Sequence, residues 1–333
     1  MPSDSTIAPA KPATQTMRAV VVVGPRLTEI EHLKLPEPGP GEIRLRLEGC
    51  GVCGSNLPMW EGRPWFHYPA EPGSPGHEGW GVVDALGAGV TTVAPGDRVA
   101  ALSYKAYAEY DVAAAEAVVP LPEDLAGRFF PGEPLGCAMN IFRRSDIHAG
   151  QTVVIIGIGF LGAILTRLAS RAGARVIAIS RRPFALDLAR ELGAHIAMPL
   201  DDHQKIVDHV QRVTGGEGAE RVLEVVGAQW PLDLAADLTR VRGRLVIAGY
   251  HQDGLRQVNM QLWNWRGIDV INAHERDPAV YVAGIRDAIQ AVSSGVLNPS
   301  RLYTHTFHLD QMNQAFRIMQ ERPDGFLKAL VLT

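Results

Sequence analysis

The sequence predicts an α/β protein that combines a β-rich domain with a domain built on a doubly wound parallel sheet. Two observations support this fold class. Short apolar runs separated by Gly and Pro clusters fill residues 18–119, whereas continuous apolar runs alternate with helical stretches from about residue 150 onward. A Gly-x-Gly-x-x-Gly pattern also stands at the first strand-to-helix transition of the second part, at residues 157–162.

Composition limits the classes of protein to consider. The chain has 333 residues, which at about 150 residues per domain suggests two domains. Hydrophobic residues make up 46% and charged residues 20%, as in ordinary globular enzymes. A net charge of −4 offers no electrostatic attraction for nucleic acid or an anionic membrane. No apolar run reaches the ~18 residues of a membrane-spanning helix.

The first residues differ from the rest of the chain. Residues 1–16 are rich in Ser, Thr, Pro and Ala, and lack the charged start and apolar centre of a signal peptide. We expect a flexible leader over 1–16 and a cytoplasmic location.

The cysteines do not suggest a disulfide framework. There are three, Cys50, Cys53 and Cys137, and so few in a long chain argue against structural disulfides. The Cys50-x-x-Cys53 spacing also occurs in redox motifs. No βαβ unit follows it here, which disfavours the redox interpretation.

The first part of the chain predicts a barrel-like or sandwich-like β domain. Its turns are marked by Gly and Pro clusters such as 36–41 and 95–97. The strands that we expect between such turns lie at residues 19–23, 43–47, 81–84, 98–101 and 118–119.

The second part predicts a parallel sheet. In the run at 152–156 every residue after Thr152 is apolar, which is typical of a strand buried on both faces. Further strands are expected at 175–179, 221–225 and 244–248, with helices at 160–172 and 183–192, helix again from about 280, and a terminal strand within 325–333. This alternation indicates a doubly wound sheet.

The glycine pattern predicts a dinucleotide site. Gly157 permits a tight turn, Gly159 allows the backbone to approach a pyrophosphate, and Gly162 allows close helix–strand packing. Phe160 and Leu161 open the helix, whose free N–H groups would bind phosphate.

The end of the next strand indicates which dinucleotide is bound. NAD-binding folds usually carry Asp or Glu there, to hold the ribose 2′-hydroxyl. This chain has Ser180, Arg181 and Arg182, which lack a carboxylate and offer two guanidinium groups to a 2′-phosphate. We therefore predict NADP(H) rather than NAD(H). The alternative, that both arginines are solvated residues of a helix start, leaves the missing acid unexplained.

Cys53 and His77 are candidate zinc ligands. Thiolate and imidazole bind zinc well, and each residue is next to a glycine that lets the backbone turn around an ion. Spacing alone does not prove a site. A lone Cys53 is equally a small buried hydrophobe, and a lone His77 a hydrogen-bonded turn residue.

Six features together resemble the zinc-containing medium-chain alcohol dehydrogenases. They are residues 51–55 (Gly-Val-Cys-Gly-Ser), 75–78 (Pro-Gly-His-Glu), 93–99 (Val-Ala-Pro-Gly-Asp-Arg-Val), 133–135 (Glu-Pro-Leu), 157–162 and Lys328. The resemblance implies a GroES-like catalytic domain of residues 17–143 and 285–333. It also implies a Rossmann domain of residues 144–284, with the active site in the cleft between the two.

The same resemblance implies the ligands. Cys53 and His77 would bind one catalytic zinc, and Glu78 would be an alternate ligand or support the others. The third family position falls on Glu133, in a Glu-Pro-Leu form that resembles the polyol dehydrogenase branch, where the glutamate binds directly or through water. Cys137, one helical turn later, is a rival ligand. We favour Glu133.

The chain departs from the family pattern at several positions. The lobe of four cysteines that holds a structural zinc is missing, because Val99 runs almost directly to residues 106–110. Asn56 replaces an aspartate, and Ser180 the ribose-binding acid. Pro58 stands where many members have a relay histidine, so the proton relay must shorten to Ser55 with water or ribose hydroxyls.

The sequence therefore predicts a zinc-dependent oxidoreductase that transfers hydride between NADP(H) and a small alcohol or carbonyl substrate. Its catalytic residues would be Cys53, Ser55, His77 and Glu78. Two alternatives stay open: a zinc-free NADPH-dependent quinone or enoyl reductase of the same superfamily, and a non-catalytic dinucleotide-binding protein. By analogy with the family we expect a homodimer or homotetramer.

Overall fold

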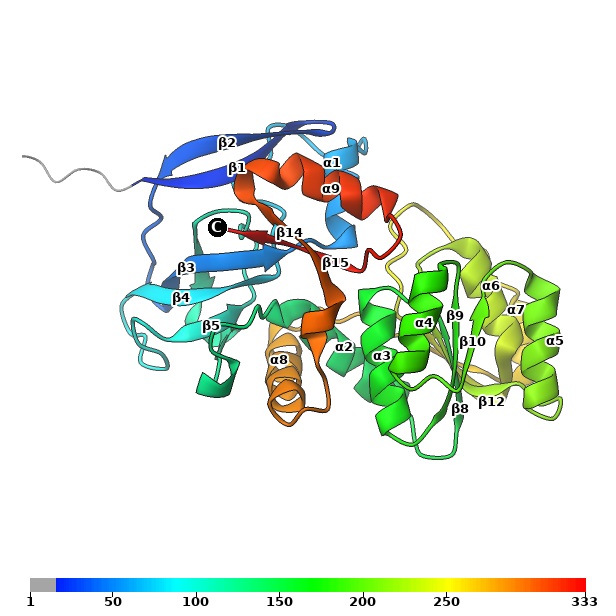
Figure 1. Cartoon of the computed structure of the whole chain (residues 1–333). Helices are drawn as coiled ribbons and strands as arrows, with labels where there is room; N and C mark the ends of the chain where they lie inside the picture. Colours follow the sequence, from blue (N-terminus) through cyan, green and yellow to red (C-terminus); the bar gives the residue numbers. More distant parts are fainter. Residues whose placement is uncertain (1–15) are drawn as a thin grey trace, which may run out of the picture.

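The computed structural model describes residues 16–333, and it divides into a β-rich lobe and a lobe with a helix-covered sheet (Figure 1). Of the predicted leader, residues 1–16, only Thr16 falls within this range. Thr16 begins β1 (Thr16–Gly24), which forms an antiparallel hairpin with β2 (Leu27–Lys34). None of the described helices combines the length and apolarity needed to cross a bilayer.

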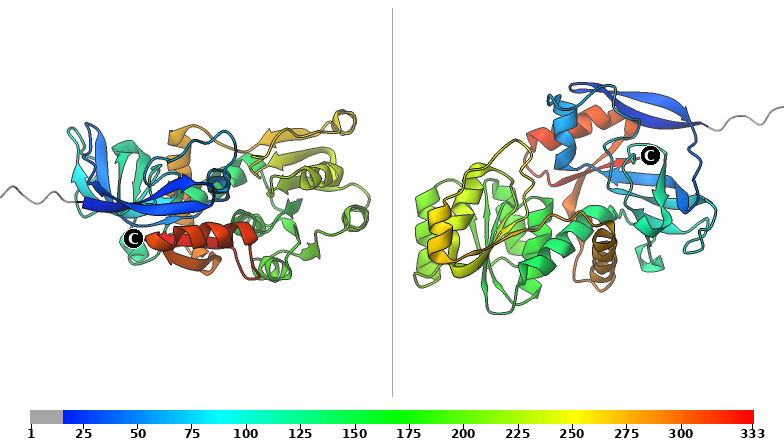
Figure 2. Two further views of the ribbon diagram at one scale, coloured as in Figure 1. Left: turned by 90° about the horizontal axis from the view of Figure 1, so that it is seen from above. Right: turned by 180° about the vertical axis from the view of Figure 1, so that it is seen from behind.

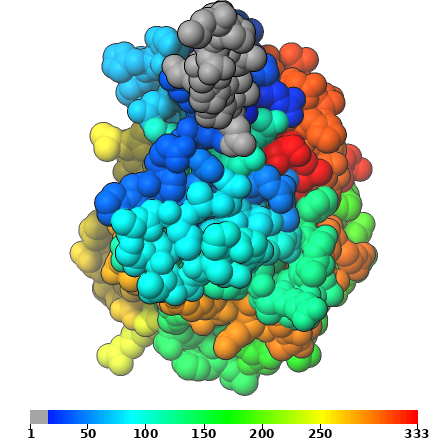
Figure 3. Space-filling model, turned by 90° about the vertical axis from the view of Figure 1, so that its left-hand side faces the viewer, coloured from blue at the N-terminus to red at the C-terminus, as the bar shows by residue number. Residues whose placement is uncertain are grey.

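The β-rich lobe is built around a seven-stranded sheet with the order β14-β15-β3-β4-β5-β7, in which β6 also pairs with β3. Its strands are β3 (Glu42–Gly51), β4 (Gly79–Leu86), β5 (Arg98–Ala101), β6 (Tyr110–Ala114), β7 (Val118–Pro120), β14 (Tyr303–His308) and β15 (Lys328–Leu332). Strand β15 runs antiparallel to β3, with Val331 opposite Cys50. The end of the chain therefore lies beside the segment that leads to Cys53, and Figure 3 shows these last residues against the first strands.

The second lobe contains a six-stranded, all-parallel sheet with the order β10-β9-β8-β11-β12-β13. Its strands are β8 (Thr152–Ile156), β9 (Arg175–Ser180), β10 (Ile196–Pro199), β11 (Ala219–Glu224), β12 (Thr239–Ile247) and β13 (Asp269–Asn272). The order reverses next to β8, the first strand of this sheet in the chain. Such a switch point, at the carboxyl ends of parallel strands, is where doubly wound sheets bind nucleotides.

Helices cover both faces of this sheet (Figure 2). Val153 and Ile155 of β8 share a core with α2 (Gly132–Ser145), α3 (Phe160–Arg171), α4 (Pro183–Glu191) and α8 (Pro278–Ser293). Val154 and Ile156 point to the other face, toward α5 (His203–Val213) and α6 (Gln229–Leu238). Burial on both faces explains why β8 is apolar at successive positions. The fold class is confirmed.

Helices α2 and α8 pack closely where the two lobes meet. A β-carbon on Gly136 would stand 2.8 Å from the backbone nitrogen of Ile285, so only glycine fits at this crossing. The predicted domain limits, at 143/144 and 284/285, fall inside these two helices. The exact limits stay a prediction.

Most predicted elements are present, but the sequence missed several short or exposed ones. These are β2, β6, β10, β13, β14, α1 (Leu57–Glu61), α7 (Met260–Arg266) and α9 (Met312–Glu321). No residue of β2 or β13 is fully buried, so their sequences lack the apolar runs of inner strands.

Candidate metal and cofactor site

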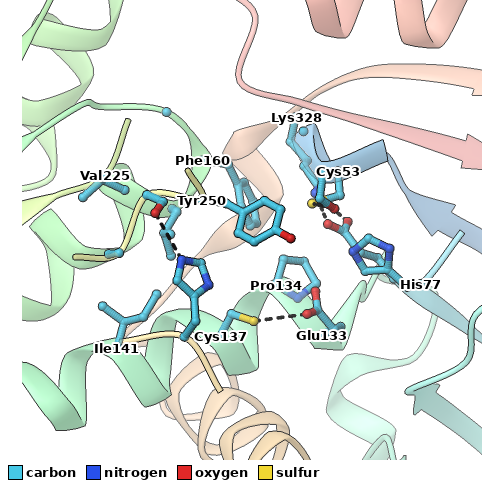
Figure 4. Close-up of a pocket in the computed structure, with 18 of the residues that line it drawn as sticks. Cys53, His77, Glu133, Pro134, Cys137, Ile141, Phe160, Val225, Tyr250 and Lys328 are labelled. Carbon is cyan, nitrogen blue, oxygen red and sulfur yellow. Dashed lines mark hydrogen bonds and ion pairs between the residues drawn. The ribbon is translucent and has the colours of Figure 1, made fainter. Parts of the chain in front are cut away.

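Three candidate ligands meet where two neighbouring strands end. Cys53 follows β3, and His77 and Glu78 directly precede β4, which pairs antiparallel with β3 so that Cys50 lies opposite Gly79. The ligand atoms of Cys53, His77 and Glu78 all lie within 4.8 Å of one another. Two segments more than twenty residues apart thus form one cluster, which we call the metal cluster (Figure 4).

A buried scaffold orients His77. Its Nδ1 lies 2.9 Å from the carbonyl oxygen of Pro75, so in the Nδ1-protonated tautomer it donates there and keeps the Nε2 lone pair for a metal ion. Asn56 donates from Nδ2 to the same carbonyl at 3.1 Å, and the Tyr107 hydroxyl donates to Asn56 Oδ1 at 2.6 Å. A second hydrogen bond of this kind is typical of metal-binding histidines. Asn56 thus helps to hold the cluster although it replaces the family's aspartate.

Electrostatic coupling also suits the cluster to a cation. Burial lowers the pKa of the His77 imidazole, but the hydrogen bond and charge of Cys53 raise it, and the result is about 10. The Ser55 hydroxyl donates to Cys53 Sγ at 3.2 Å. A thiolate, an imidazole and a carboxylate are ligands that zinc prefers, so the donor set fits zinc.

Glu78 forms a buried ion pair with Lys328 at the start of β15. The Lys328 Nζ lies 2.6 Å from Oε1 and 2.5 Å from Oε2, and the side chains are 5% and 1% exposed. Burial lowers the pKa of Lys328, but the charges of Glu78, Cys53 and Glu133 and the hydrogen bond to Glu78 together raise it above its usual value. Nζ also lies 5.2 Å from the ring centroid of Phe160, so the pair connects the metal cluster to the start of α3.

Glu133 and Cys137 line the wall opposite the metal cluster, on the first turns of α2 (Figure 4). The Cys137 thiol donates to Glu133 Oε1 at 3.1 Å. Burial raises the pKa of the Glu133 carboxyl, and burial also raises that of the Cys137 thiol. Neither side chain belongs to the group of three ligand atoms. The choice between them as a further ligand stays a prediction.

The glycine turn has the geometry of a phosphate cradle. Gly157 has φ +100°, and a β-carbon on Gly162 would stand 2.0 Å from the Gly157 carbonyl oxygen. Nothing lies within 4 Å of a β-carbon on Gly159, which faces the open pocket. Phe160 and Leu161 begin α3 beside it and line the same pocket.

The two arginines after β9 differ in exposure and in hydrogen bonding. Ser180 is buried at the end of the strand. The Arg182 guanidinium donates to the carbonyl oxygen of Ile158 at 3.3 Å and to that of Phe326. Arg181 is exposed, and within residues 16–333 its side chain makes neither a hydrogen bond nor an ion pair.

One pocket of about 560 Å³ between the lobes is lined by the metal cluster, Glu133, Cys137, turn residues 159–162 and Arg182. Sequence reasoning missed Tyr250, which projects into the pocket (Figure 4), and Gln252, whose Nε2 donates across it to the Gly54 carbonyl oxygen at 3.3 Å. Both follow β12, so their place after a parallel strand could have indicated them. Arg322, after α9, also lines the pocket, and no local pattern points to it.

Comparison with known families gives two matches, one to each lobe. Residues 39–123 match the alcohol dehydrogenase GroES-like domain, and residues 161–289 match the zinc-binding dehydrogenase family. The two matches contain Cys53, His77 and Glu78 in the first and Leu161 and Gly162 in the second.

Curated relatives agree with this result. An alcohol dehydrogenase of Rhizobium meliloti is 31% identical over 269 residues, which cover 70% of this chain and 77% of the relative. A sorbitol dehydrogenase of Halalkalibacterium halodurans is 28% identical over 320 residues, which cover 86% and 91%.

Solved structures share the fold. The 2R,3R-butanediol dehydrogenase of Bacillus subtilis superposes with a TM-score of 0.82 at 24% identity, over 95% of this chain and 99% of that one. A zinc-binding dehydrogenase of Sinorhizobium meliloti with bound NADP gives 0.80 at 24% identity, over 96% and 100%. Together with the relatives, these findings show that the chain belongs to the zinc-type medium-chain alcohol dehydrogenase superfamily of oxidoreductases.

Proposed function

We propose that this protein transfers hydride between NADP(H) and a small alcohol or carbonyl compound, with one catalytic zinc per chain. The observation that carries the proposal is that the metal cluster and the glycine turn line the same pocket. Cys53 and His77 would hold the ion, with Glu78 and Glu133 as further or alternate ligands. The sorbitol dehydrogenases among the relatives support a polyol-like substrate.

The protein's own groups would position the substrate and move one proton. Bound zinc would supply a Lewis acid that draws electron density from the substrate oxygen. The Ser55 hydroxyl, beside Cys53, would accept the hydroxyl proton during oxidation and return it during reduction. Pro58 carries no exchangeable proton, so the relay would continue from Ser55 through water or a ribose hydroxyl. The nicotinamide carries the hydride itself.

The preference for NADP(H) rests on the end of β9. Ser180 stands where an acid would repel a 2′-phosphate, and the exposed Arg181 is free to pair with one. The Sinorhizobium meliloti structure, which contains NADP, supports this choice. By analogy with the family we also propose a homodimer or homotetramer, which light scattering would measure.

The alternative is a zinc-free reductase that uses NADPH to reduce a quinone or an enoyl group. A mycobacterial quinone oxidoreductase shares the fold, with a TM-score of 0.79 at 23% identity. The intact metal cluster favours the zinc enzyme. A non-catalytic protein would bind dinucleotide but turn over none of a panel of alcohols, aldehydes and ketones.

Zinc content tests the proposal directly. We expect about one zinc per chain in the wild type, a loss of zinc in Cys53→Ala, and unchanged zinc in Cys50→Ala, whose buried thiol donates to the Gly51 carbonyl oxygen and is not one of the three clustered ligand atoms. Elemental analysis and NADPH oxidation would be measured on the same samples. Wild-type protein without zinc, or Cys53→Ala with full zinc and full activity, would refute the zinc mechanism.

Ser55 is tested separately. Removing a proton relay lowers kcat about 100- to 10,000-fold. We expect a loss of this size in Ser55→Ala, much recovery in Ser55→Thr, and no loss of zinc in either variant. Equal kcat values for Ser55→Ala and the wild type would exclude Ser55 as the relay.

A further inference from the structure

We propose that Arg322 binds the diphosphate of the dinucleotide from the side opposite the glycine turn, while Arg181 alone contacts the 2′-phosphate. This inference rests on the proposed binding of NADP(H). It assigns to Arg322 a role that no sequence motif indicates, and it gives Arg182 a different role from the one that its position after β9 predicts.

Arg322 lies on the β-rich side of the pocket. It caps the C-terminal end of α9 and lines the same pocket as Gly159, Phe160 and Leu161. Its Nη2 lies 3.8 Å from the point where a β-carbon on Gly54 would stand. Because Gly54 directly follows Cys53, the guanidinium lies close to the metal end of the pocket.

Arg322 also belongs to a cluster of like charges. Burial and the charge of Arg181 lower the pKa of Arg322, and burial and the charge of Arg322 lower the pKa of Arg182. Asp324 opposes this effect at Arg182, but from beyond ion-pair distance. Among the described residues, none of the three arginines forms an ion pair within 4.0 Å. Clustered guanidinium groups without carboxylates are a site for an anion.

Arg182 is already occupied. Its two terminal nitrogens donate to the Ile158 and Phe326 carbonyl oxygens, which ties the glycine turn to the segment before β15. A phosphate contact would have to replace these bonds. Arg182 is therefore a positioning residue. The Arg322 guanidinium donates only from Nε, to the Met319 carbonyl oxygen at 3.4 Å, so among the described residues its two terminal nitrogens, like the side chain of Arg181, remain available to a phosphate.

The expected order of adenosine ribose, diphosphate and nicotinamide along the pocket indicates which phosphate each arginine would bind. In a doubly wound sheet the adenosine ribose lies at the end of the second strand, here β9, and the diphosphate lies over the glycine turn. The nicotinamide would then reach the metal cluster. Arg322 lines the pocket together with residues 159–161 of the turn, and its Nη2 lies 3.8 Å from the β-carbon position of Gly54, so it faces the part between the two riboses. That part is the diphosphate, which NADPH and NADH share.

Binding measurements with both cofactors test this assignment. The dissociation constants of NADPH and NADH would be measured by nucleotide fluorescence for wild type, Arg181→Gln and Arg322→Gln. Arg317→Gln, on the exposed face of α9 and outside the pocket, is the matched control. Arg322 has φ +48°, which glutamine tolerates no worse than arginine, and thermal melting would verify folding.

The expected pattern separates the two arginines. Arg322→Gln should weaken NADPH and NADH binding by the same factor, about 10- to 100-fold, because hydrogen bonds to a charged group are lost. Arg181→Gln should weaken NADPH binding by a similar factor and leave NADH within about 2-fold, and Arg317→Gln should change neither. Arg322→Lys, which keeps the charge but not the fork, should lie between wild type and Arg322→Gln.

Two results would overturn the inference. One is unchanged binding of both cofactors to folded Arg322→Gln, and the other is a loss confined to NADPH. The proposed function fails differently: wild-type protein would bind neither nucleotide, or would bind NADH more tightly than NADPH. If the wild type prefers NADH, an equal weakening of NADPH and NADH binding in Arg322→Gln would still support the role of Arg322 at the diphosphate.

Discussion

The two ends of the pocket handle charge in opposite ways. At the metal end, charges are buried and paired, as in the Glu78–Lys328 pair with side chains 1% and 5% exposed. At the cofactor end, Arg322 lines the pocket and Arg181 is exposed, and neither has a carboxylate partner within 4.0 Å among residues 16–333. Under the proposed function the metal end would hold a small cation, whereas the cofactor end would depend on its ligand to supply negative charge.

The two ends also differ in how they are built. The metal end uses side chains from three segments that are far apart in the sequence, around Cys53, His77 and Lys328. The cofactor end uses the backbone of one continuous turn, residues 157–162, where a missing side chain matters as much as a present one. Removal of a side chain should therefore damage the metal end, and addition of a side chain should damage the turn.

The largest effect on stability is expected from Lys328→Met. This change leaves Glu78 as a buried charge without a counter-ion, which costs about 3–5 kcal/mol in the free energy of unfolding. Chemical denaturation of the zinc-free proteins would measure it, because a bound ion would itself neutralise Glu78. The control is Arg301→Met, which removes an exposed pair with Glu191 (side chains 70% and 53% exposed) and should cost at most about 1 kcal/mol. Similar losses in the two variants would mean that the buried pair contributes no more to the free energy of unfolding than the exposed pair does.

The next effect concerns the third ligand on α2. If Glu133 holds the metal directly or through water, Glu133→Gln should weaken zinc binding about 10- to 100-fold. Cys137→Ser keeps the size of the side chain and its contact with Glu133, so zinc affinity should hardly change. Competition with a chelator would measure both. The reverse order of effects would make Cys137 the ligand.

The fold could be predicted because its main signals are local. The apolar run of β8 and the glycines that follow it lie within eleven residues. The run indicates a buried strand at its own position, and the glycines indicate a tight turn at theirs. The alternation of strands and helices then restricts the sheet to the doubly wound class. Strands β2 and β13 were not predicted, because edge strands with little burial lack a continuous apolar run.

The site could be predicted only in part, because its partners are distant in sequence. Cys53, His77 and the glycine turn were found as separate motifs. Lys328 pairs with Glu78 across 250 residues, and Arg182 bonds to Phe326 across 144, contacts that exist only because the chain returns to the first lobe. No spacing rule describes such contacts. For the same reason the place of Arg322 in the pocket could not be foreseen.

A smaller effect is expected from Gly162→Ala in the turn. Its β-carbon would stand 2.0 Å from the Gly157 carbonyl oxygen, so the turn must shift, at a cost of about 1–3 kcal/mol in stability. Gly159→Ala is the matched change, because its β-carbon meets no atom within 4 Å and its φ is −95°. It should keep stability but obstruct the phosphate. Melting curves and NADPH titrations would separate the two variants, and equal stability losses would contradict this account of the turn.

The smallest effect is expected on the far side of the sheet, at Asp146, whose side chain is 44% exposed. There Oδ2 lies 3.1 Å from Arg221 Nη2 and 3.4 Å from Arg244 Nη1. Desolvation raises the pKa of Asp146, but the charges of His148, Arg244 and Arg221 together lower it below its usual value. A carboxyl with a lowered folded-state pKa stabilises the fold above its unfolded pKa of about 3.9 and loses this effect as pH falls.

Asp146→Asn keeps a residue that tolerates φ +52°, so only the charge is removed. Because these pairs are partly exposed, we expect a loss of about 0.2–1 kcal/mol at pH 7 that shrinks as pH falls below the unfolded pKa of about 3.9 and through the lower folded-state pKa, and that also shrinks in high salt. Urea denaturation at several pH values would measure it. A loss as large as that of Lys328→Met would mean that burial does not make the Glu78–Lys328 pair more important for stability than the exposed pairs of Asp146. A loss independent of pH would mean that the charge of Asp146 is not its cause.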